Sequence, residues 1–415
     1  GKHYAVYGLA RSGLATAEAL LASDARVTAW DSKEEARAKA PAGSEIANLD
    51  VADLAQFDSL VVTPGLPLNR HKIAQRARMS GVEIIGDIEL FARARPELPP
   101  HKVVGITGTN GKSTTTALIH HILKTAGVPT TMGGNIGLPI LAQDPLPEGG
   151  IYVLELSSYQ VDLTQTLDCD VALLLNITPD HLDRYESFEA YAASKARLFE
   201  MQTRQHVAIV GHADKIICDA LSGANSSIKF IDGRSLDQSN WPTLQGPHNA
   251  QNAAAAIECC QILGVDEAGI EEALRSYPGL PHRMERIREN GGVLFVNDSK
   301  ATNPTATAPA LAAFDRIRWI CGGQAKTDNL DECAPHFDHV RKAYTIGEAS
   351  ELFASLLSPH MAVAECKTLE RAVGEAAAEA EPGDTVLLSP ACASFDQFRD
   401  FEDRGDQFRQ LVEGL

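Results

Sequence analysis

Short, strongly apolar runs alternate along this chain with longer stretches in which apolar residues recur every three or four positions. The runs have the length of buried strands and occupy residues 3–8, 102–107, 151–156, 171–176, 293–298 and 384–389. The longer stretches have the spacing of amphipathic helices and include residues 12–22, 113–126, 249–263 and 369–380. This alternation predicts an α/β protein with parallel, doubly wound sheets. Ligands of such sheets bind at the carboxyl ends of the strands, where candidate functional residues are therefore sought.

Two proline-rich segments, residues 95–101 and 277–283, interrupt the alternation and predict the joints between domains. We expect three domains, covering residues 1–93, 94–279 and 280–415. The expected folds are a Rossmann-like N-terminal domain, a central P-loop-type ATPase domain with a mostly parallel sheet, and a Rossmann-like C-terminal domain.

The charge balance of the chain restricts its partners. Its 37 Lys and Arg residues face 55 Asp and Glu residues, which gives a formal net charge of −18. Nucleic acid requires a basic face, so we expect no nucleic-acid partner. An anionic small molecule can still bind where a few cations are gathered locally.

Cysteine spacing and hydropathy indicate a cytoplasmic protein. The eight cysteines form no C-x-x-C pair or disulfide framework, as is usual in a reducing compartment. The chain start lacks the pattern of a signal peptide. No apolar run reaches the roughly 18 residues that span a bilayer, so membrane insertion is not expected.

A glycine-rich turn joins the strand at 102–107 to the helical stretch that follows. Gly108 and Gly111 allow backbone N–H groups to surround phosphate oxygens. Lys112 supplies a positive charge, and the Ser113 hydroxyl suits Mg²⁺. The usual P-loop spacing would place glycine at Ile106, so the match is P-loop-like. A chance strand–helix turn is the alternative, and ATP is the predicted ligand.

A second glycine-containing turn, residues 8–13, follows the first strand and resembles a dinucleotide fingerprint with Ala10 at the second glycine position. A tight packing turn explains it as well as phosphate binding does. Asp31, after the next strand, is a candidate for a ribose contact. A dinucleotide-dependent oxidoreductase is therefore an alternative, but it leaves residues 108–114 and 297–303 unexplained.

Glu155 and His181 each follow an apolar strand. If these strands neighbour the phosphate-loop strand, the two side chains can hold Mg²⁺ or Mn²⁺ with phosphate oxygens. Otherwise they are unrelated surface groups. A ligase needs such a site, because two negative charges about 4 Å apart repel by roughly 4 kcal/mol at an effective dielectric constant of 20.

Eight segments, beginning with the phosphate loop, follow one another in a recognisable order. They are GTNGKST (108–114), GGNIGLP (133–139), LELSSYQ (154–160), NITPDHLDRY (176–185), GPHNAQNAAAA (246–256), LPHRME (280–285), NDSKATNP (297–304) and LSPACASFDQFRDFEDRGDQF (388–408). In this order they resemble the Mur ligases. The last two narrow the resemblance to members that add D-glutamate to UDP-N-acetylmuramoyl-L-alanine during peptidoglycan precursor synthesis.

The resemblance implies an ATP-dependent amide ligase that acts through an acyl phosphate, with two Mg²⁺ ions and a CO₂-derived carbamate on Lys195. It implies catalytic roles for Lys112, Glu155, His181, Lys195 and Lys300. The implied metal ligands are Ser113, Glu155, His181 and the Lys195 carbamate. The implied nucleotide contacts are Gly108, Thr109, Asn110, Gly111, Lys112, Ser113, Thr114, Asn249, Asn252, Arg283 and Asp298. The implied substrate contacts are Ser12, Asp31, Thr63, Pro64, Gly65, Asn135, Thr302, Lys326, Ser394 and Phe401.

The resemblance leaves related activities open. A ligase that uses L-glutamate, or another Mur or folylpolyglutamate-type ligase, remains the alternative. The segment SPACASFDQF at residues 389–398 argues against the diaminopimelate-adding members. The implied partners are the two small-molecule substrates, and we expect a monomer.

Overall fold

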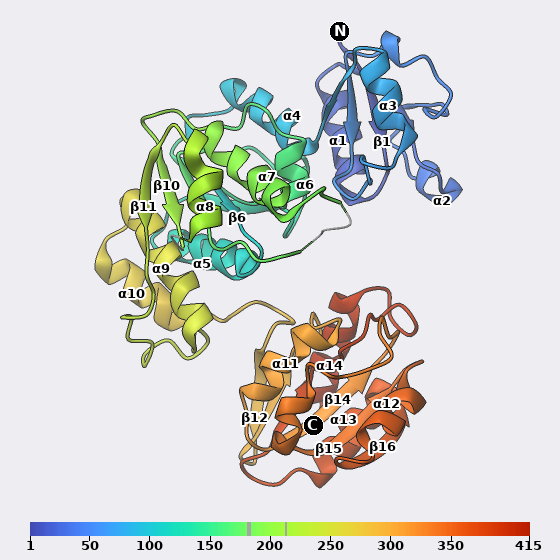
Figure 1. Ribbon diagram of the computed structural model, residues 1–415, viewed down its shortest axis with the longest axis vertical. Coiled ribbons are helices and arrows are strands. Elements are labelled where there is room, and N and C mark those ends of the chain that lie inside the picture. The colour runs from blue at the N-terminus through green and yellow to red at the C-terminus, as the bar shows by residue number, and fades with distance from the viewer. Residues whose placement is uncertain (181–183, 212–213) are drawn as a thin grey trace. The chain divides into compact units, whose positions relative to one another are not determined.

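The computed structural model describes residues 1–180, 184–211 and 214–415. The chain forms two compact units, Gly1–Tyr277 and Pro278–Leu415 (Figure 1). The first unit contains two sheets and the second contains one. The predicted α/β class is confirmed. The boundary between the units falls inside the proline-rich segment 277–283, while the division at residue 93 stays a prediction.

The N-terminal sheet is parallel, with the strand order β3-β2-β1-β4-β5. Its strands are β1 (His3–Tyr7), β2 (Arg26–Trp30), β3 (Glu45–Ile46), β4 (Ser59–Val62) and β5 (Glu83–Ile85). Its helices are α1 (Arg11–Ala22), α2 (Glu34–Arg37) and α3 (Lys72–Met79), with the short 3₁₀ turn η1 (Leu54–Gln56). The connecting helix α4 (Asp87–Ala94), followed by the 3₁₀ turn η2 (Arg95–Glu97), packs mainly against the core of the central sheet. Apolar residues of α1 cover one face and those of α3 the other. The strand order reverses between β1 and β4, so ligand-binding loops are expected beside that point.

The central sheet is also parallel, with the order β11-β10-β9-β6-β8-β7. Its strands are β6 (His101–Thr107), β7 (Thr130–Gly134), β8 (Gly150–Glu155), β9 (Val171–Leu174), β10 (Val207–Val210) and β11 (Ser227–Phe230). Its helices are α5 (Lys112–Thr125), α6 (Ser158–Asp162), α7 (Phe188–Glu200), α8 (Lys215–Ala220), α9 (Pro247–Ile262) and α10 (Glu267–Ser276), with η3 (Ile140–Ala142) and η4 (Leu221–Gly223). Helix α5 packs against α9 and α10.

Buried contacts join these two sheets within the first unit. The Leu163 side chain belongs to the hydrophobic cluster of the N-terminal sheet, and its carbonyl accepts a hydrogen bond from Gly86 N–H at 3.1 Å. The buried Glu89 carboxylate accepts from the N–H groups of Gln165 (2.7 Å) and Thr166 (2.9 Å). These contacts hold the carboxyl edge of the N-terminal sheet against the central one.

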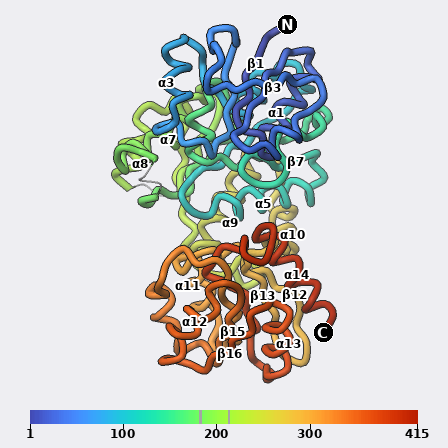
Figure 2. The backbone as a smooth tube through the Cα atoms, turned by 90° about the vertical axis from the view of Figure 1, so that its right-hand side faces the viewer, coloured from blue at the N-terminus to red at the C-terminus, as the bar shows by residue number. Residues whose placement is uncertain are grey.

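The second unit has one six-stranded sheet with the order β12-β13-β17-β14-β15-β16. Its strands are β12 (Glu285–Asn290), β13 (Val293–Asn297), β14 (Ile317–Gly322), β15 (Val340–Ile346), β16 (Ala362–Lys367) and β17 (Thr385–Leu388). Only β12 among them pairs antiparallel. Helices α11 (Pro304–Ala312) and α12 (Ser350–Leu357), with η5 (Ala334–His339), lie on one face, and α13 (Leu369–Glu379) and α14 (Phe401–Glu413) on the other. Figure 2 shows α14 close to β12 and β13.

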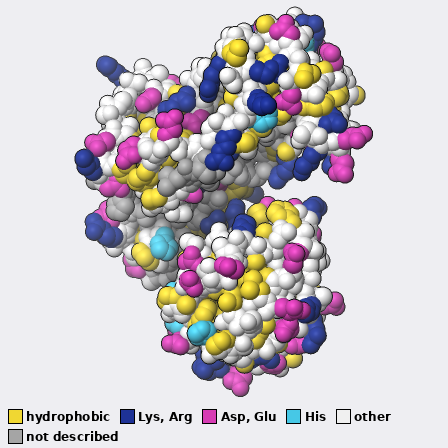
Figure 3. All heavy atoms as spheres, turned by 45° about the vertical axis from the view of Figure 1, so that its right-hand side comes forward, with side chains coloured by type: hydrophobic (Ala, Val, Ile, Leu, Met, Phe, Trp, Pro, Cys, Tyr) yellow, Lys and Arg dark blue, Asp and Glu magenta, His cyan; other side chains and the backbone are white. Residues whose placement is uncertain are grey.

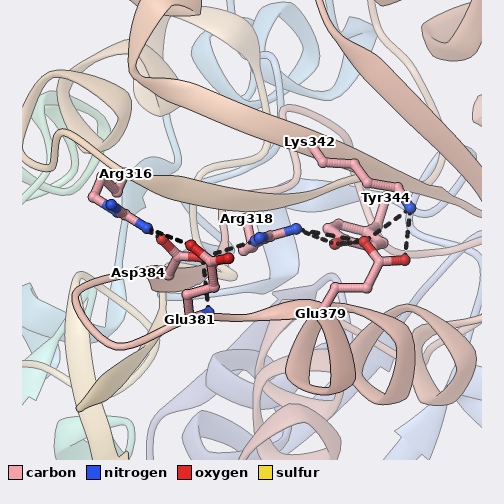
Figure 4. A network of polar contacts seen from close by, with 7 residues as sticks. All are labelled: Arg316, Arg318, Lys342, Tyr344, Glu379, Glu381 and Asp384. Atoms are coloured by element: carbon pink, nitrogen blue, oxygen red, sulfur yellow. Dashed lines mark hydrogen bonds and ion pairs between the residues drawn. The ribbon is translucent and has the colours of Figure 1, made fainter.

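An ion-pair network lies at the edge of this sheet where its parallel strands begin (Figure 4). The buried Asp384 carboxylate accepts from Arg316 Nε at 2.8 Å and from Arg318 Nε at 2.9 Å. Lys342 and Tyr344 in turn contact Glu379. Burial alone would raise the pKa of Asp384, but the Glu381 N–H and the two guanidinium groups lower it overall. The network ties β14, β15 and β17 together at the edge opposite the strand ends that carry the predicted site.

On the face drawn in Figure 3, acidic and basic side chains are interspersed over each unit. Within the described residues, no helix is both long and apolar enough to cross a membrane.

Candidate active site

The phosphate loop lies at the centre of the central sheet. It leaves β6, runs through Gly108–Gly111 and enters α5 at Lys112. Gly111 has φ +82°, and an added Cβ would lie 2.3 Å from Asn252 Oδ1, so only glycine fits there. Gly108 has φ +146° and packs against Leu175. The turn is therefore constrained both by its own backbone and by α9.

Asn176, from the loop after β9, fixes the shape of the phosphate loop. Its carbonyl accepts from Thr109 N–H at 2.9 Å, and its side chain accepts from Asn110 N–H at 2.8 Å and donates to Asn110 O at 3.0 Å. Thr109 Oγ1 also contacts Tyr191 OH at 3.2 Å. Asn176 was not among the predicted site residues. An asparagine placed directly after a buried strand that neighbours β6 was the available signal.

Two lysines converge on one carbonyl of the loop. Lys112 Nζ donates to Gly108 O and Thr109 O, each at 2.9 Å, and Lys195 Nζ donates to Gly108 O at 2.9 Å. Lys195 comes from α7, is 2% exposed, and its Nζ lies 4.6 Å above the Tyr191 ring. Burial, and then the charge of Lys112, lower the pKa of Lys195 to about 7. A buried amine with this pKa is neutral in about half of the molecules near pH 7, whereas a solvated lysine is almost fully protonated.

Glu155 ends β8, and β8 pairs directly with β6, which meets the condition set for a metal site beside the phosphate loop. The side chain is 2% exposed. Oε1 accepts from Asn135 Nδ2 at 2.9 Å, whereas Oε2 is buried with no hydrogen-bond partner among the described residues. A buried carboxylate oxygen without a donor fits a metal cation. Asn135, predicted only as a substrate contact, thus also orients this carboxylate.

The other predicted metal ligands are placed as follows. Ser113 and Thr114 are half-buried in the first turn of α5. Strand β9 also pairs directly with β6 and leads into residues 176–180, but His181 itself lies outside the described residues. Among the described residues, no group of three or more His, Cys, Asp or Glu side chains gathers to hold a metal. Of the predicted ligands, the described residues thus supply the Glu155 carboxylate and the Ser113 hydroxyl, and Lys195 could join them only as a carbamate.

The predicted adenine-side residues stand in the first turns of α9. Asn252 is buried and packs on Gly111, and its Nδ2 donates to Asn249 Oδ1 at 3.4 Å. Asn249 Nδ2 donates to Gln245 O at 3.1 Å. Helices α5 and α9 are packed together, which brings both asparagines beside the phosphate loop.

The predicted UDP loops gather at the carboxyl edge of the N-terminal sheet. Gly8, with φ +95°, lies so close to Thr63 that an added Cβ would be 2.6 Å from its Oγ1. Asp31 accepts from Leu9 N–H (2.8 Å) and Lys33 N–H (2.9 Å), so it organises the neighbouring loops. Ser12 stands in the first turn of α1, and Pro64 and Gly65 follow β4.

The predicted glutamate pocket lies wholly in the second unit, at the carboxyl ends of its strands. Lys326 Nζ donates to Thr302 Oγ1 at 3.3 Å, and a bridge between Gln324 and Ala393 sets Ser394 beside this pair. Lys300 Nζ lies 5.2 Å from the Phe401 ring centre. The structure therefore groups these predicted residues along one edge.

Two more predicted nucleotide residues, Arg283 and Asp298, also belong to the second unit. Arg283 is exposed. Asp298 is buried, and its carboxylate accepts from Met284 N–H (3.1 Å) and Ser389 Oγ (2.8 Å). Burial raises the pKa of Asp298 to about 7 despite these donors.

Arg404 is a structural part of this pocket that the sequence analysis missed. Its buried guanidinium donates to Ser299 O (2.8 Å), Cys392 O (3.1 Å) and Ala393 O (3.3 Å). Burial lowers the pKa of Arg404 to about 10. The side chain ties together the two loops that carry the predicted pocket. Its position inside the quoted C-terminal segment was the only available signal.

Three segments of the chain match models of known protein domains. Residues 106–241 match the Mur ligase middle domain, residues 282–392 the glutamate ligase domain of Mur ligases, and residues 2–86 the MurD-like N-terminal domain of Mur ligases. The chain belongs to the Mur ligase family.

Relatives within this family align over their whole length. The UDP-N-acetylmuramoylalanine–D-glutamate ligase of Novosphingobium aromaticivorans is 60% identical over 421 residues, covering 100% of this chain and 95% of that protein. The ligase of the same name from Caulobacter vibrioides is 43% identical over 452 residues, covering 100% and 96%.

Solved structures share the fold at low identity. UDP-N-acetylmuramate-alanine ligase MurC from Thermotoga maritima has a TM-score of 0.61 at 18% identity and covers 100% of this chain and 99% of its own. Folylpolyglutamate synthase/dihydrofolate synthase from Yersinia pestis, solved with AMPPNP and a Mn ion, has a TM-score of 0.55 at 18% identity and covers 79% and 93%.

Proposed function

We propose that this Mur ligase joins D-glutamate to UDP-N-acetylmuramoyl-L-alanine at the expense of ATP. The observation that carries the proposal is the meeting of Glu155, Lys112 and Lys195 around one glycine-rich loop, in a chain whose full-length relatives bear the name of this activity. The acceptor carboxylate attacks the γ-phosphate, giving an acyl phosphate and ADP. The glutamate amine then attacks the acyl carbon, and inorganic phosphate leaves as the amide forms.

The first unit holds ATP and the acceptor in this scheme. Backbone N–H groups of residues 108–111 and the Lys112 ammonium bind the phosphates. Asn249 and Asn252 face adenine, and the loops at Ser12, Asp31 and 63–65 bind the UDP portion. Charge neutralisation is the main catalytic task, because two anionic reactants must approach each other.

A divalent cation belongs beside the phosphate loop. The unpartnered Oε2 of buried Glu155 and the Ser113 hydroxyl fit Mg²⁺ or Mn²⁺, and His181 is proposed for a second ion. When bound, such ions supply positive charge to the phosphate oxygens. Asn135 keeps the Glu155 carboxylate oriented, and the protein groups around it exclude water.

Lys195 is proposed to carry a carbamate. CO₂ reacts only with a neutral amine: the amine nitrogen bonds to the carbon, a proton is released, and an anionic N-carboxylate forms. Burial beside Lys112 keeps much of the Lys195 amine neutral at pH 7. The product places an anion beside the Lys112 ammonium in place of the neutral amine, which improves the local charge balance.

In the second unit, Lys300, Thr302, Lys326 and Ser394 are proposed to hold the two glutamate carboxylates, with Phe401 against the side-chain methylenes. Arg283 and Asp298 are proposed nucleotide contacts. We further infer a cytoplasmic monomer, because ATP is an intracellular substrate and all eight cysteines are unpaired. A sedimentation mass corresponding to two chains would contradict the monomer.

A substrate panel tests the activity. Purified enzyme is incubated with ATP, Mg²⁺, UDP-N-acetylmuramoyl-L-alanine and single amino acids, including D- and L-glutamate, and products are scored by mass. We expect the acceptor–glutamate adduct with D-glutamate and phosphate release that needs all four components. Equal product from L-glutamate would favour the alternative ligase, and full phosphate release without any amino acid would contradict the proposal.

A further inference from the structure

One arginine of the central sheet's loops reaches the loop that follows β4 in the N-terminal sheet. Arg184 Nη2 donates to Leu66 O at 2.9 Å and Nη1 to Gly65 O at 3.4 Å. Gly65 belongs to the segment proposed to bind UDP. These bonds therefore connect the loop proposed to bind the acceptor with Arg184 of the central sheet's loops.

The same guanidinium is stacked on the aromatic ring of Tyr159. Arg184 Cζ lies 4.1 Å from the centre of the Tyr159 ring, within cation–π range. Tyr159 stands in α6, directly after the segment that leaves β8. An arginine suits this position because a planar guanidinium can stack with its face and donate with its edge at the same time.

Aromatic contacts continue from Tyr159 to the phosphate loop. The Tyr159 and Tyr185 rings are stacked at 6.2 Å with an interplanar angle of 16°, and the Tyr185 and Tyr191 rings are 5.4 Å apart. Tyr191 OH contacts Thr109 Oγ1 at 3.2 Å, and its ring lies beneath the Lys195 ammonium. A continuous set of packed side chains thus runs from the acceptor loop to the phosphate loop.

The middle ring, that of Tyr185, is held at its hydroxyl group, which also contacts Ser194 Oγ at 3.2 Å. Tyr185 OH donates to Asp162 Oδ2 at 2.8 Å, and Ser194 Oγ donates to Asp162 Oδ1 at 2.7 Å. A shift of Arg184 therefore cannot be absorbed by free rotation of Tyr185. A shift of the Arg184 side chain must either move the Tyr159 ring or be resisted by that ring.

We propose that Arg184 is a positioning residue that couples binding of the UDP-linked acceptor to the alignment of the phosphate loop. Acceptor bound at residues 63–65 fixes the carbonyl groups of Gly65 and Leu66, to which Arg184 donates hydrogen bonds. The stacked rings then hold Thr109 and Lys195 in their ATP-binding positions. By linkage, nucleotide binding must tighten acceptor binding by the same factor. The inference rests on the proposed function, since it takes the acceptor and ATP as the two ligands.

Titration calorimetry tests the coupling. The affinity for UDP-N-acetylmuramoyl-L-alanine is measured with and without AMPPNP and Mg²⁺, in the wild type, Arg184→Met and the control Arg234→Met. Arg234 is an exposed arginine of the same unit that pairs with Asp232 at 2.6 Å. We expect AMPPNP to tighten acceptor binding in the wild type and control by a factor in the usual range of about 5 to 150. In Arg184→Met this factor should fall to near one, while the affinity for AMPPNP alone stays unchanged.

Two further variants keep the test decisive. Tyr159→Leu removes the stacking partner but leaves both carbonyl groups, and it should lose the coupling as Arg184→Met does. Arg184→Lys keeps the positive charge but lacks the planar guanidinium group, which donates two hydrogen bonds at once. This variant should therefore retain only part of the coupling. Undiminished coupling in Arg184→Met, or no coupling in a wild type that binds both ligands, overturns the inference. A wild type that does not bind the acceptor at all overturns the proposed function instead.

Discussion

Replacing Lys195 by methionine should make the protein more stable and inactive at the same time. The Lys195 amine is buried, and its described hydrogen bond goes to a neutral carbonyl, Gly108 O. Its pKa falls from 10.5 to about 7 on folding. Methionine has a similar volume and no charge, so Lys195→Met removes the cost of burying the amine without opening a cavity.

The size of the effect follows from the pKa difference. Each pKa unit corresponds to about 1.4 kcal/mol, so the drop from 10.5 to about 7 represents on the order of 4 to 5 kcal/mol in favour of the neutral amine. The unfolded state holds more protons than the folded state between these two values, so wild-type stability rises with pH across that window. The advantage of Lys195→Met should therefore be largest below pH 7 and shrink by about 1.4 kcal/mol per pH unit toward pH 10.5.

The assay is urea unfolding of both proteins from pH 6 to pH 10, in CO₂-depleted buffer without nucleotide. Other titrating groups are shared by the two proteins, so the difference in unfolding free energy isolates Lys195. Activity should be nearly abolished, and short carboxylates should partly restore it in Lys195→Ala by filling the place of the carbamate. A stability difference that is independent of pH would contradict the lowered pKa of Lys195. A fully active Lys195→Ala would contradict the proposed carbamate.

Three other substitutions test the remaining parts of the site and fold. Asn135→Ala releases Glu155 Oε1 and should lower kcat about 10- to 100-fold, with a higher Mg²⁺ requirement in steady-state assays; unchanged Mg²⁺ dependence would contradict the positioning role. Gly111→Ala should abolish AMPPNP binding, measured by calorimetry, because the Cβ meets Asn252 at 2.3 Å, whereas Gly127→Ala, also at positive φ but with open space around its Cβ, should bind AMPPNP normally. Asp384→Asn should lower the unfolding free energy of the second unit by about 2 to 3 kcal/mol near pH 7, the value of hydrogen bonds to a charged group. Because the pKa of Asp384 is lowered on folding, this difference should be present above the unfolded pKa and disappear as the pH falls through the folded value; a difference that persists in acid would count against it.

Much of the fold could be predicted from periodicity alone. The expected helix at 249–263 is α9 (Pro247–Ile262), and the expected strand at 3–8 is β1 (His3–Tyr7). Both patterns are local, because a strand buried on both faces and a helix with one apolar face each leave a distinct spacing. The antiparallel pairing of β12 was not predicted, because strand direction depends on a partner distant in sequence.

The residues of the candidate site also fall into two groups: those recognisable from the sequence and those whose surroundings only the structure shows. The glycines of the phosphate loop and Lys112 were recognisable because their chemistry depends on neighbours in the chain. The sequence by itself also determined that Glu155 ends a strand. It could not determine that this strand pairs with β6, that Asn135 holds Oε1, or that Lys195 is buried against Gly108 rather than solvated on a helix. Those facts were decided only by the tertiary structure, because a side chain's hydration and charge environment depend on residues brought close by folding, not on the residues beside it in the chain.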